Sequence, residues 1–267
     1  MSFEAVVLGI AQDGGVPHPG CACATCEARA NGRAPRLHVA CLGLTDGTRH
    51  ALVDATPDLP AQLRLLGAAR PDALFLTHAH MGHVAGLLYL GREALAVRDV
   101  PVHGTAAMQR HLRGNAPWRE LETQGHVRYA DAGRTEFGDL VVEALPVPHR
   151  AEHTDTVAYR IRGPRGALLY VPDIDAWDAW DHDVRALVAS VDVALLDATF
   201  FAPEELPHRD PREVPHPFVT DTLARLDGLG ARVRLIHLNH TNRLLADETP
   251  ARSRGFAVAR EGERFAL

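Results

Sequence analysis

Three histidines lie close together in LTHAHMGHVAGLL, residues 76–88. His78 and His80 are two residues apart where an apolar stretch ends, so both imidazoles can point at one ion. His83 follows at the start of a helical pattern and can face the same ion or a second one. Neutral imidazole binds zinc, iron, manganese and copper. The pattern HxHxxH after an apolar strand therefore predicts a metal site rather than three unrelated loop histidines.

More side chains of the ligand type stand where other predicted strands end. They are Asp54 after ALV, His149 after EALPVP, Asp173 after ALLYVP and His237 after VRLI. In layered α/β folds, the strand ends and the loops beyond them build the active site. One such residue would carry little information, but their repetition at successive strand ends predicts that they converge on one spot.

A second candidate metal site lies near the start of the chain. Cys21, Cys23 and Cys26 fall within CACATC, after the turn-forming stretch DGGVPHPG. In a reducing cytoplasm this spacing favours a metal over disulfides. Structural zinc normally takes four ligands, so a fourth is needed, and His18, His38 and Cys41 are near in sequence.

Composition excludes several classes of function. The 267-residue chain carries a net charge of −6 and has no Lys/Arg-rich stripe, so we expect no nucleic-acid partner. It contains no lysine, which excludes Schiff-base chemistry on a lysine. No run of about 18 apolar residues suggests a membrane span, and the start lacks a signal-peptide pattern. We therefore expect a cytoplasmic protein.

The hydrophobic patterns predict a single domain over residues 1–267, with mixed sheets and helices outside them. Expected strands cover 4–10, 38–45, 51–56, 73–78, 100–104, 140–147, 156–162, 167–173, 191–199 and 233–240. Expected helices cover 58–67, 83–96, 105–113, 177–189 and 217–228, with Asp58 and Thr105 as N-caps. The proline-rich stretch 200–217 is expected to be an ordered surface loop.

The ordered set of motifs resembles the metallo-β-lactamase superfamily. The resemblance rests on HxHxxH after a strand, which is HAHMGH here, with ALVDATPDL upstream, VPHR and VPD downstream and a late histidine on a strand; GCACATC, YVPDIDAW, LLDATFF and IHLNHTN support one branch of it. Within the superfamily, the chain resembles the branch of coenzyme PQQ synthesis protein B-like proteins. The early cysteine group also resembles the phosphodiesterase of carbon–phosphorus lyase pathways. These resemblances imply an αββα sandwich of two mixed β-sheets flanked by helices, with the metal site between the sheets.

Carried over by position, the resemblance implies two neighbouring metal positions. The first would take His78, His80 and His149, and Asp173 would bridge to a second that also takes His83 and His237. His153 competes with His149, which is preferred because it directly follows the strand and a proline-fixed turn.

The motif departs from the family at Gly82, where an aspartate normally adds a ligand to the second position. We therefore expect that position to be weakened or empty, unless a water or a carboxylate from elsewhere fills the gap.

The resemblance also implies supporting residues. Asp54 and Asp197 would hold the ligands by hydrogen bonds, and His216 would act as a proton donor or substrate anchor. The fourth ligand of the cysteine site would be His240, which follows His237 by three residues.

These assignments predict a structural zinc ion and one or two active-site ions of zinc, manganese or iron. An ion with open positions lowers the pKa of a bound water from 15.7 towards about 7 and supplies a nucleophile for ester or phosphodiester hydrolysis, with Asp173 orienting it. Two alternatives stay open: an iron- and oxygen-dependent enzyme that tailors a modified peptide, and a non-catalytic carrier. We expect a small-molecule or modified-peptide substrate and a possible homodimer.

Overall fold

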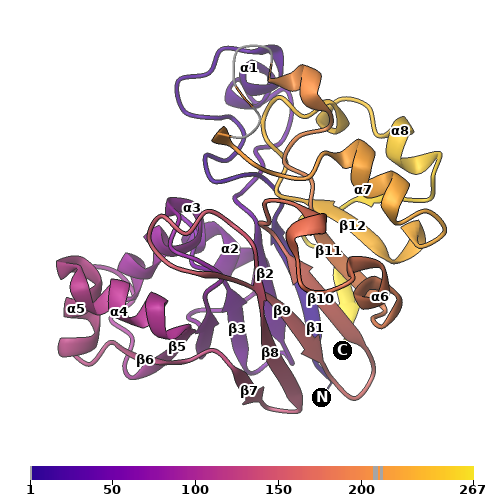
Figure 1. The fold of residues 1–267 in the computed structure, drawn as a ribbon. Coiled ribbons are helices and arrows are strands. Elements are labelled where there is room, and N and C mark those ends of the chain that lie inside the picture. Colours follow the sequence, from indigo (N-terminus) through magenta and orange to yellow (C-terminus); the bar gives the residue numbers. More distant parts are fainter. Residues whose placement is uncertain (1, 207–209, 211–212) are drawn as a thin grey trace.

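Two seven-stranded β-sheets face each other in the computed structural model, and helices cover their outer surfaces (Figure 1). The structure describes residues 2–206, 210 and 213–267. The predicted αββα sandwich is confirmed. Both chain ends lie at the end of the sandwich opposite to α1 (Ala24–Ala30), as Figure 1 shows.

The first sheet has the order β14-β1-β2-β3-β4-β5-β6. It is antiparallel from β14 to β3 and parallel from β3 to β6. Its strands are β1 (Glu4–Gly9), β2 (Cys41–Thr45), β3 (His50–Val53), β4 (Ala73–Phe75), β5 (Val100–Gly104), β6 (Val127–Asp131) and β14 (Arg264–Ala266).

The second sheet has the order β13-β12-β11-β10-β9-β8-β7. It is antiparallel from β7 to β10 and parallel from β10 to β13. Its strands are β7 (Arg134–Phe137), β8 (Leu140–Val147), β9 (Thr156–Arg162), β10 (Ala167–Val171), β11 (Val193–Asp197), β12 (Val233–Ile236) and β13 (Ala257–Val258).

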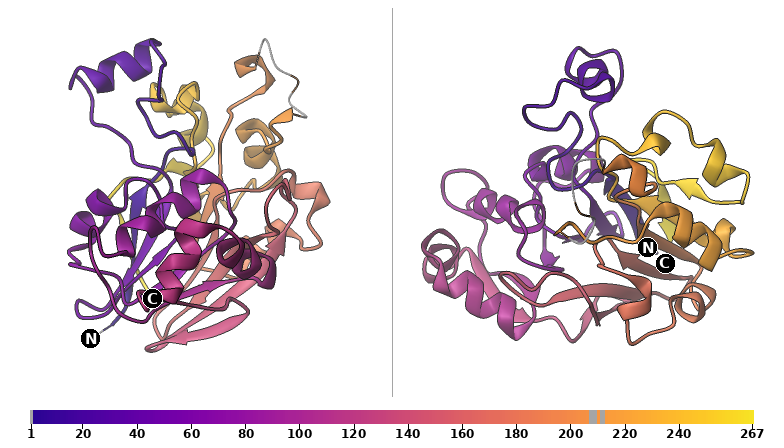
Figure 2. Two further views of the ribbon diagram at one scale, coloured as in Figure 1. Left: turned by 90° about the vertical axis from the view of Figure 1, so that its left-hand side faces the viewer. Right: turned by 45° about the horizontal axis from the view of Figure 1, so that its top comes forward.

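Helices cover the two outer faces, as the turned views in Figure 2 show. Beside the first sheet lie α2 (Leu59–Leu66), α3 (Met81–Val84), α4 (Ala106–Gly114) and α5 (Ala116–Thr123). Beside the second lie α6 (Val184–Ala189), α7 (Val219–Arg225) and α8 (Thr249–Arg252). Short 3₁₀ helices cover Ala85–Leu90, Trp177–Ala179, Pro203–Glu205, Gly230–Arg232 and Arg243–Leu245. Within the described residues, none of the helices has the length and apolar character needed to cross a bilayer.

The main core lies between the sheets, and a second cluster packs under the helices of the first sheet. Phe75 and Tyr159 meet edge to face across the sheets, with ring centroids 5.8 Å apart. The hydroxyl of Tyr159 donates to the carbonyl of Leu76 at 2.8 Å, so this buried ring also has its polar end satisfied. These contacts fix the end of β4, from which His78 follows.

Two expected helices are interrupted. The segment 177–189 forms a 3₁₀ turn and then α6, because Asp183 caps a new helix by accepting from the amides of Arg185 and Ala186. The segment 83–96 continues α3 only as a 3₁₀ helix to Leu90. Gly86 fits closely there: a Cβ on it would lie 2.0 Å from the carbonyl oxygen of Thr56.

One of the two predicted helix N-caps forms its capping hydrogen bond and the other does not. Thr105 caps α4 by accepting from the amide of Met108, as predicted. Asp58 stands before α2 without capping it, and its carboxylate accepts from the amide of Val39 instead. The predicted surface loop 200–217 contains the 3₁₀ turn Pro203–Glu205, and its positions 207–209 and 211–212 lie outside the described residues.

Candidate metal centre

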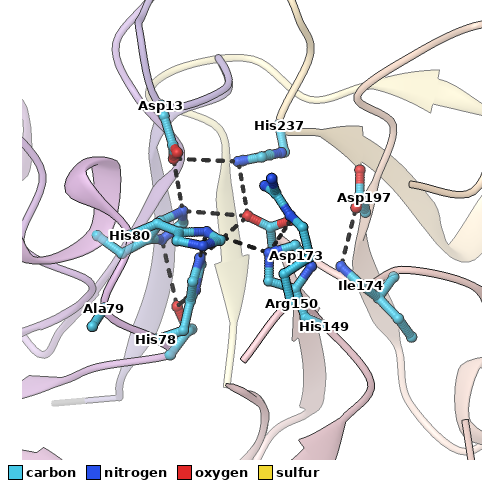
Figure 3. A network of polar contacts seen from close by, with 12 residues as sticks. Asp13, His78, Ala79, His80, His149, Arg150, Asp173, Ile174, Asp197 and His237 are labelled. Atoms are coloured by element: carbon cyan, nitrogen blue, oxygen red, sulfur yellow. Dashed lines mark hydrogen bonds and ion pairs between the residues drawn. The ribbon is translucent and has the colours of Figure 1, made fainter. Parts of the chain in front are cut away.

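The predicted ligands meet where strands of both sheets end. Beyond β4 the chain carries His78, beyond β8 it carries His149, beyond β10 Asp173 and beyond β12 His237. Figure 3 shows these side chains pointing toward one another, with Asp173 between the others. The site therefore draws on both sheets, and its geometry depends on how the sandwich packs.

The first group consists of His78, His80, His149 and Asp173, whose ligand-type atoms all lie within 4.8 Å of one another. Nε2 of His78 is 2.8 Å from Nδ1 of His80, which is 3.3 Å from Nε2 of His149. The carboxylate of Asp173 approaches His78 at 3.5 Å and His149 at 3.3 Å. His153 lies outside this group, with its ring centroid 6.5 Å from that of His80.

The second group consists of Asp13, His83, Asp173 and His237. Oδ2 of Asp173, the oxygen that faces His78, also lies 3.6 Å from Nε2 of His83 and 3.3 Å from Nε2 of His237. Asp173 therefore stands between the two groups, as expected of a bridging ligand. Asp13 was not expected from the sequence, and its Oδ1 is 3.2 Å from Nε2 of His83.

The chemistry of the second group fits a metal ion. Oδ1 of Asp13, Nε2 of His83 and Nε2 of His237 are all buried and make no well-aligned hydrogen bond among the described residues, although Asp13 and His83 approach as an ion pair. Leaving such atoms unsatisfied costs about 1–3 kcal/mol each. Two imidazole nitrogens and two carboxylates are a donor set that suits zinc, iron or manganese, and coordination would satisfy all of them.

Charge and burial act together on these side chains. Burial alone would raise the pKa of Asp173, but the surrounding imidazoles, first that of His237, hold it well below its usual range. Burial and the neighbouring His83 lower the pKa of His78. Burial opposes protonation of His83, yet the carboxylates of Asp54 and then Asp13 raise its pKa well above the usual range, so a metal ion would have to displace that proton to bind Nε2.

Asp54 supports the second group from beneath. It is fully buried at the end of β3 and accepts from Nδ1 of His83 at 2.7 Å and from the amide and hydroxyl of Thr77 at 2.8 and 2.9 Å. A proton held on Nδ1 leaves the lone pair of Nε2 free to face the ion. Asp54 is therefore placed to position His83 rather than to bind a metal or a substrate.

Asp197 positions His216 by hydrogen bonds, as Asp54 positions His83. Its Oδ2 accepts from the amide of Ile174 and from Nδ1 of His216, at 3.1 and 2.7 Å, and its Oδ1 accepts from the amide and hydroxyl of Thr199. Burial opposes protonation of His216, yet the carboxylates of Asp197 and then Asp173 raise its pKa to about 9. Because both carboxylate oxygens of Asp197 already accept hydrogen bonds, Asp197 is placed to support His216 rather than to bind a metal ion.

The cysteine group forms a separate site. Cys21, Cys23, Cys26 and His240 bring their sulfur and nitrogen atoms within 4.8 Å of one another. Nδ1 of His240 is 3.5 Å from the sulfur of Cys21 and 3.6 Å from that of Cys23. A set of three thiols and one imidazole matches structural zinc.

The other candidates for the fourth ligand lie elsewhere. Cys41 is buried at the start of β2, with its sulfur 3.6 Å from the carbonyl oxygen of Asp54. His38 bonds to Glu261 at 2.8 Å through Nδ1. The ring of His18 lies tilted beside that of His240, with centroids 4.8 Å apart, and the amide of His18 donates to the sulfur of Cys26.

Two cavities flank His216 and differ in charge. One, of about 310 Å³, has Arg150, Asn239 and His240 in its wall. The other, of about 640 Å³, is lined by three aspartates and Arg225. Nε of Arg150 is buried without a hydrogen-bond partner in the described part of the chain. The smaller cavity therefore suits an anionic group, and the larger one disfavours it.

Sequence reasoning missed Asp13 and Arg150. The signal for Asp13 was indirect: a glycine at position 82 implied that a carboxylate was absent there, and Asp13 lies in a glycine-rich turn directly after a buried strand. Arg150 follows His149 immediately, and nothing in its neighbours separates it from a surface arginine.

Residues 49–237 match the family model described as β-lactamase superfamily domain. The chain belongs to the metallo-β-lactamase superfamily. Within it, similar curated relatives include coenzyme PQQ synthesis B proteins. That of Cupriavidus necator is 30% identical, with 98% of each chain covered. That of Methylobacterium nodulans is 29% identical, over 99% of this chain and all of the relative.

Solved structures of this superfamily show the same fold. Zinc-bound PqqB from Methylobacterium extorquens superposes with a TM-score of 0.83 at 23% identity, covering 99% of this chain and 100% of that one. A diphosphatase of the PhnP family gives 0.75 at 22% identity, covering 100% and 98%. These likenesses establish the fold of this chain.

Proposed function

We propose that this protein is a metal-dependent hydrolase that cleaves a small anionic ester or phosphodiester in the cytoplasm. One observation carries the proposal: Asp173 stands between two groups of imidazole and carboxylate atoms, and the second group holds buried atoms that have no hydrogen-bond partner among the described residues. Such a pair of positions is the arrangement that hydrolytic two-metal sites use. Membership of the superfamily and the placement of Arg150 support it.

Ions held by these residues would supply a water of lowered pKa and a positive charge beside the oxygen that becomes negative. The protein's own groups complete the site. Oδ1 of Asp173 has no hydrogen-bond partner within the described chain and is placed to accept from the attacking water. His216, whose Nδ1 lies 2.7 Å from Asp197 and 3.4 Å from Asp173, would transfer a proton to the leaving oxygen. Arg150 would face the negative charge of the substrate.

The test combines elemental analysis with two reactions. Protein purified without added metal is assayed with bis(p-nitrophenyl) phosphate and p-nitrophenyl acetate in zinc or manganese, and separately for oxygen uptake with ferrous iron. We expect metal-dependent turnover that is lost in Asp173→Asn and kept in Asp99→Asn, a surface aspartate that pairs with Arg128 at 3.4 Å.

The alternatives give different results. Oxygen consumption with iron and no hydrolysis of either ester would overturn the proposal in favour of the oxidative tailoring reaction. Metal binding without either reaction would favour the carrier reading. Unchanged turnover in Asp173→Asn would show that the activity does not come from this site.

A further inference from the structure

The second group contains a carboxylate that does not belong to the histidine motif. Asp13 lies in the loop after β1, 69 residues before Gly82 in the chain. Its Oδ1 is 3.2 Å from Nε2 of His83 and 3.8 Å from Nε2 of His237. Figure 3 shows Asp13 and His237 reaching the site from two different segments of chain. Asp13 thus stands beside the two histidines of the second position.

Asp13 and a side chain at position 82 would occupy the same space. A Cβ built on Gly82 would lie 2.2 Å from Oδ1 of Asp13 and 2.8 Å from its Cα. Position 82 is inside the helical turn α3, so the backbone there does not require glycine. Glycine is needed because the carboxylate of Asp13 passes over it. A side chain at position 82 and the observed carboxylate of Asp13 therefore exclude each other.

The loop that carries Asp13 is fixed on its N-terminal side by the turn after His237. The amide of Gln12 donates to the carbonyl of Leu238 at 3.0 Å, and the amide of Leu238 donates to the carbonyl of Ile10 at 2.8 Å. These two bonds place residues 10–12 alongside the residue that follows His237. Asp13 and His237 are therefore positioned by the same short ladder.

The same loop is fixed on its C-terminal side by the cysteine site. Cys21 and Cys23 meet His240, and His240 belongs to the turn that begins at His237. A metal ion on these residues would bind the loop after Asp13 to the turn after His237. Ligands of the two sites are thus carried by the same two segments, residues 10–26 and 237–240.

We propose that Asp13 is a ligand of the second active-site ion in place of a motif aspartate, and that the cysteine site controls how tightly this ion is held. An ion on the cysteines limits the motion of Asp13 and His237 together, which lowers the entropy lost when the second ion binds. The effect is reciprocal, because binding at either site favours binding at the other. The proposal uses the metal positions of the proposed function, but it does not depend on which reaction they support.

The first test measures the metal content and zinc affinity of Asp13→Ala. We expect it to lose one equivalent, or to bind that equivalent at least about tenfold more weakly, which is the least effect usual for residues that merely support ligands. The double variant Asp13→Gly/Gly82→Asp restores the family arrangement and should regain the lost equivalent. Gln12→Ala changes the same loop without removing a carboxylate and should bind zinc as the wild type does.

The second test measures the coupling with cobalt, whose thiolate absorption reports the cysteine site separately from the histidine sites. We expect Cys23→Ser to lose the thiolate signal and also to weaken the second ion severalfold, while the first ion on His78, His80 and His149 is kept. Cys41→Ala replaces a buried cysteine outside the cluster and should keep the thiolate signal and both active-site ions.

Two results would overturn the proposal. Asp13→Ala with the full metal content and unchanged affinity would remove Asp13 from the site. Cys23→Ser with a lost thiolate signal but an unchanged second affinity would remove the coupling. If Asp13→Ala does not fold, as judged by circular dichroism, Asp13→Asn and the double variant answer the same question. Because the readout is metal content, a failed esterase assay leaves these results intact.

Discussion

Replacing Asp54 by Asn is expected to disable the second metal position through the tautomer of His83. Asp54 accepts from Nδ1 of His83 at 2.7 Å and from Thr77 at 2.8 and 2.9 Å. In Asp54→Asn the single amide oxygen stays with Thr77, because that backbone amide is buried and needs an acceptor. The NH2 group then faces Nδ1 of His83, which must accept, so its proton moves to Nε2 and blocks the atom that faces the ion.

The structure sets the size of this effect. Asp54 and His83 are both fully buried, so water cannot replace the lost contact. A hydrogen bond to a charged group contributes about 1.5–3 kcal/mol, and apo-protein stability should fall by roughly that amount. For the metal, loss of a supporting partner weakens affinity about 10–100-fold, which corresponds to about 1.4–2.7 kcal/mol.

Zinc titration by calorimetry, together with urea unfolding of the metal-free protein, measures both quantities. Asp175→Asn is the matched control, because Asp175 accepts from Nδ1 of His149 at 2.8 Å and so supports the first group. We expect Asp54→Asn to weaken the second ion and Asp175→Asn to weaken the first. An Asp54→Asn protein that binds both ions with wild-type affinity would refute the reasoning.

Two further predictions concern stability. Gly86→Ala should lower the free energy of unfolding, measured in urea, by about 3 kcal/mol, because the added Cβ would lie 2.0 Å from a backbone oxygen. Gly114→Ala has open space around the added Cβ and should change this free energy little. Equal effects of the two substitutions would contradict this account. Glu261→Gln should cost roughly 0.5–1 kcal/mol. The hydrogen bond that Glu261 accepts from Nδ1 of His38 raises the pKa of His38 above 6.5, so this cost should be present below pH 6.5 and disappear as pH rises through the raised value. A cost independent of pH would count against this account.

Most of the sandwich could be predicted because its long strands coincide with continuous apolar runs in the sequence. The run LVVEALPV became β8 with the expected bounds, and TVAYRIR became β9. The strands that were missed are short or lie near sheet edges, such as β13 (Ala257–Val258) and β14 (Arg264–Ala266). Two or three residues carry no periodic signal, and only pairing with a neighbouring strand makes them extended.

The candidate site could be predicted where residues follow strands, since strand ends are visible in the sequence. His149 and Asp173 both follow buried strands and both lie in the first group. Asp13 could not be predicted, because its role depends on the empty space over Gly82, which exists only after two distant segments pack. Sequence patterns report local structure, whereas this contact is set by the approach of the loop to α3.

The last strand has a consequence for how the sandwich is completed. β14 pairs with β1, and the amide of Leu267 donates to the carbonyl of Phe3 at 2.9 Å. Every strand of the second sheet is synthesised before β14, so the outer edge of β1 stays open until translation has passed all of them. Unpaired edges recruit strands from other chains. A chain that stops after β13 would therefore expose an aggregation-prone edge on the strand that leaves the ribosome first.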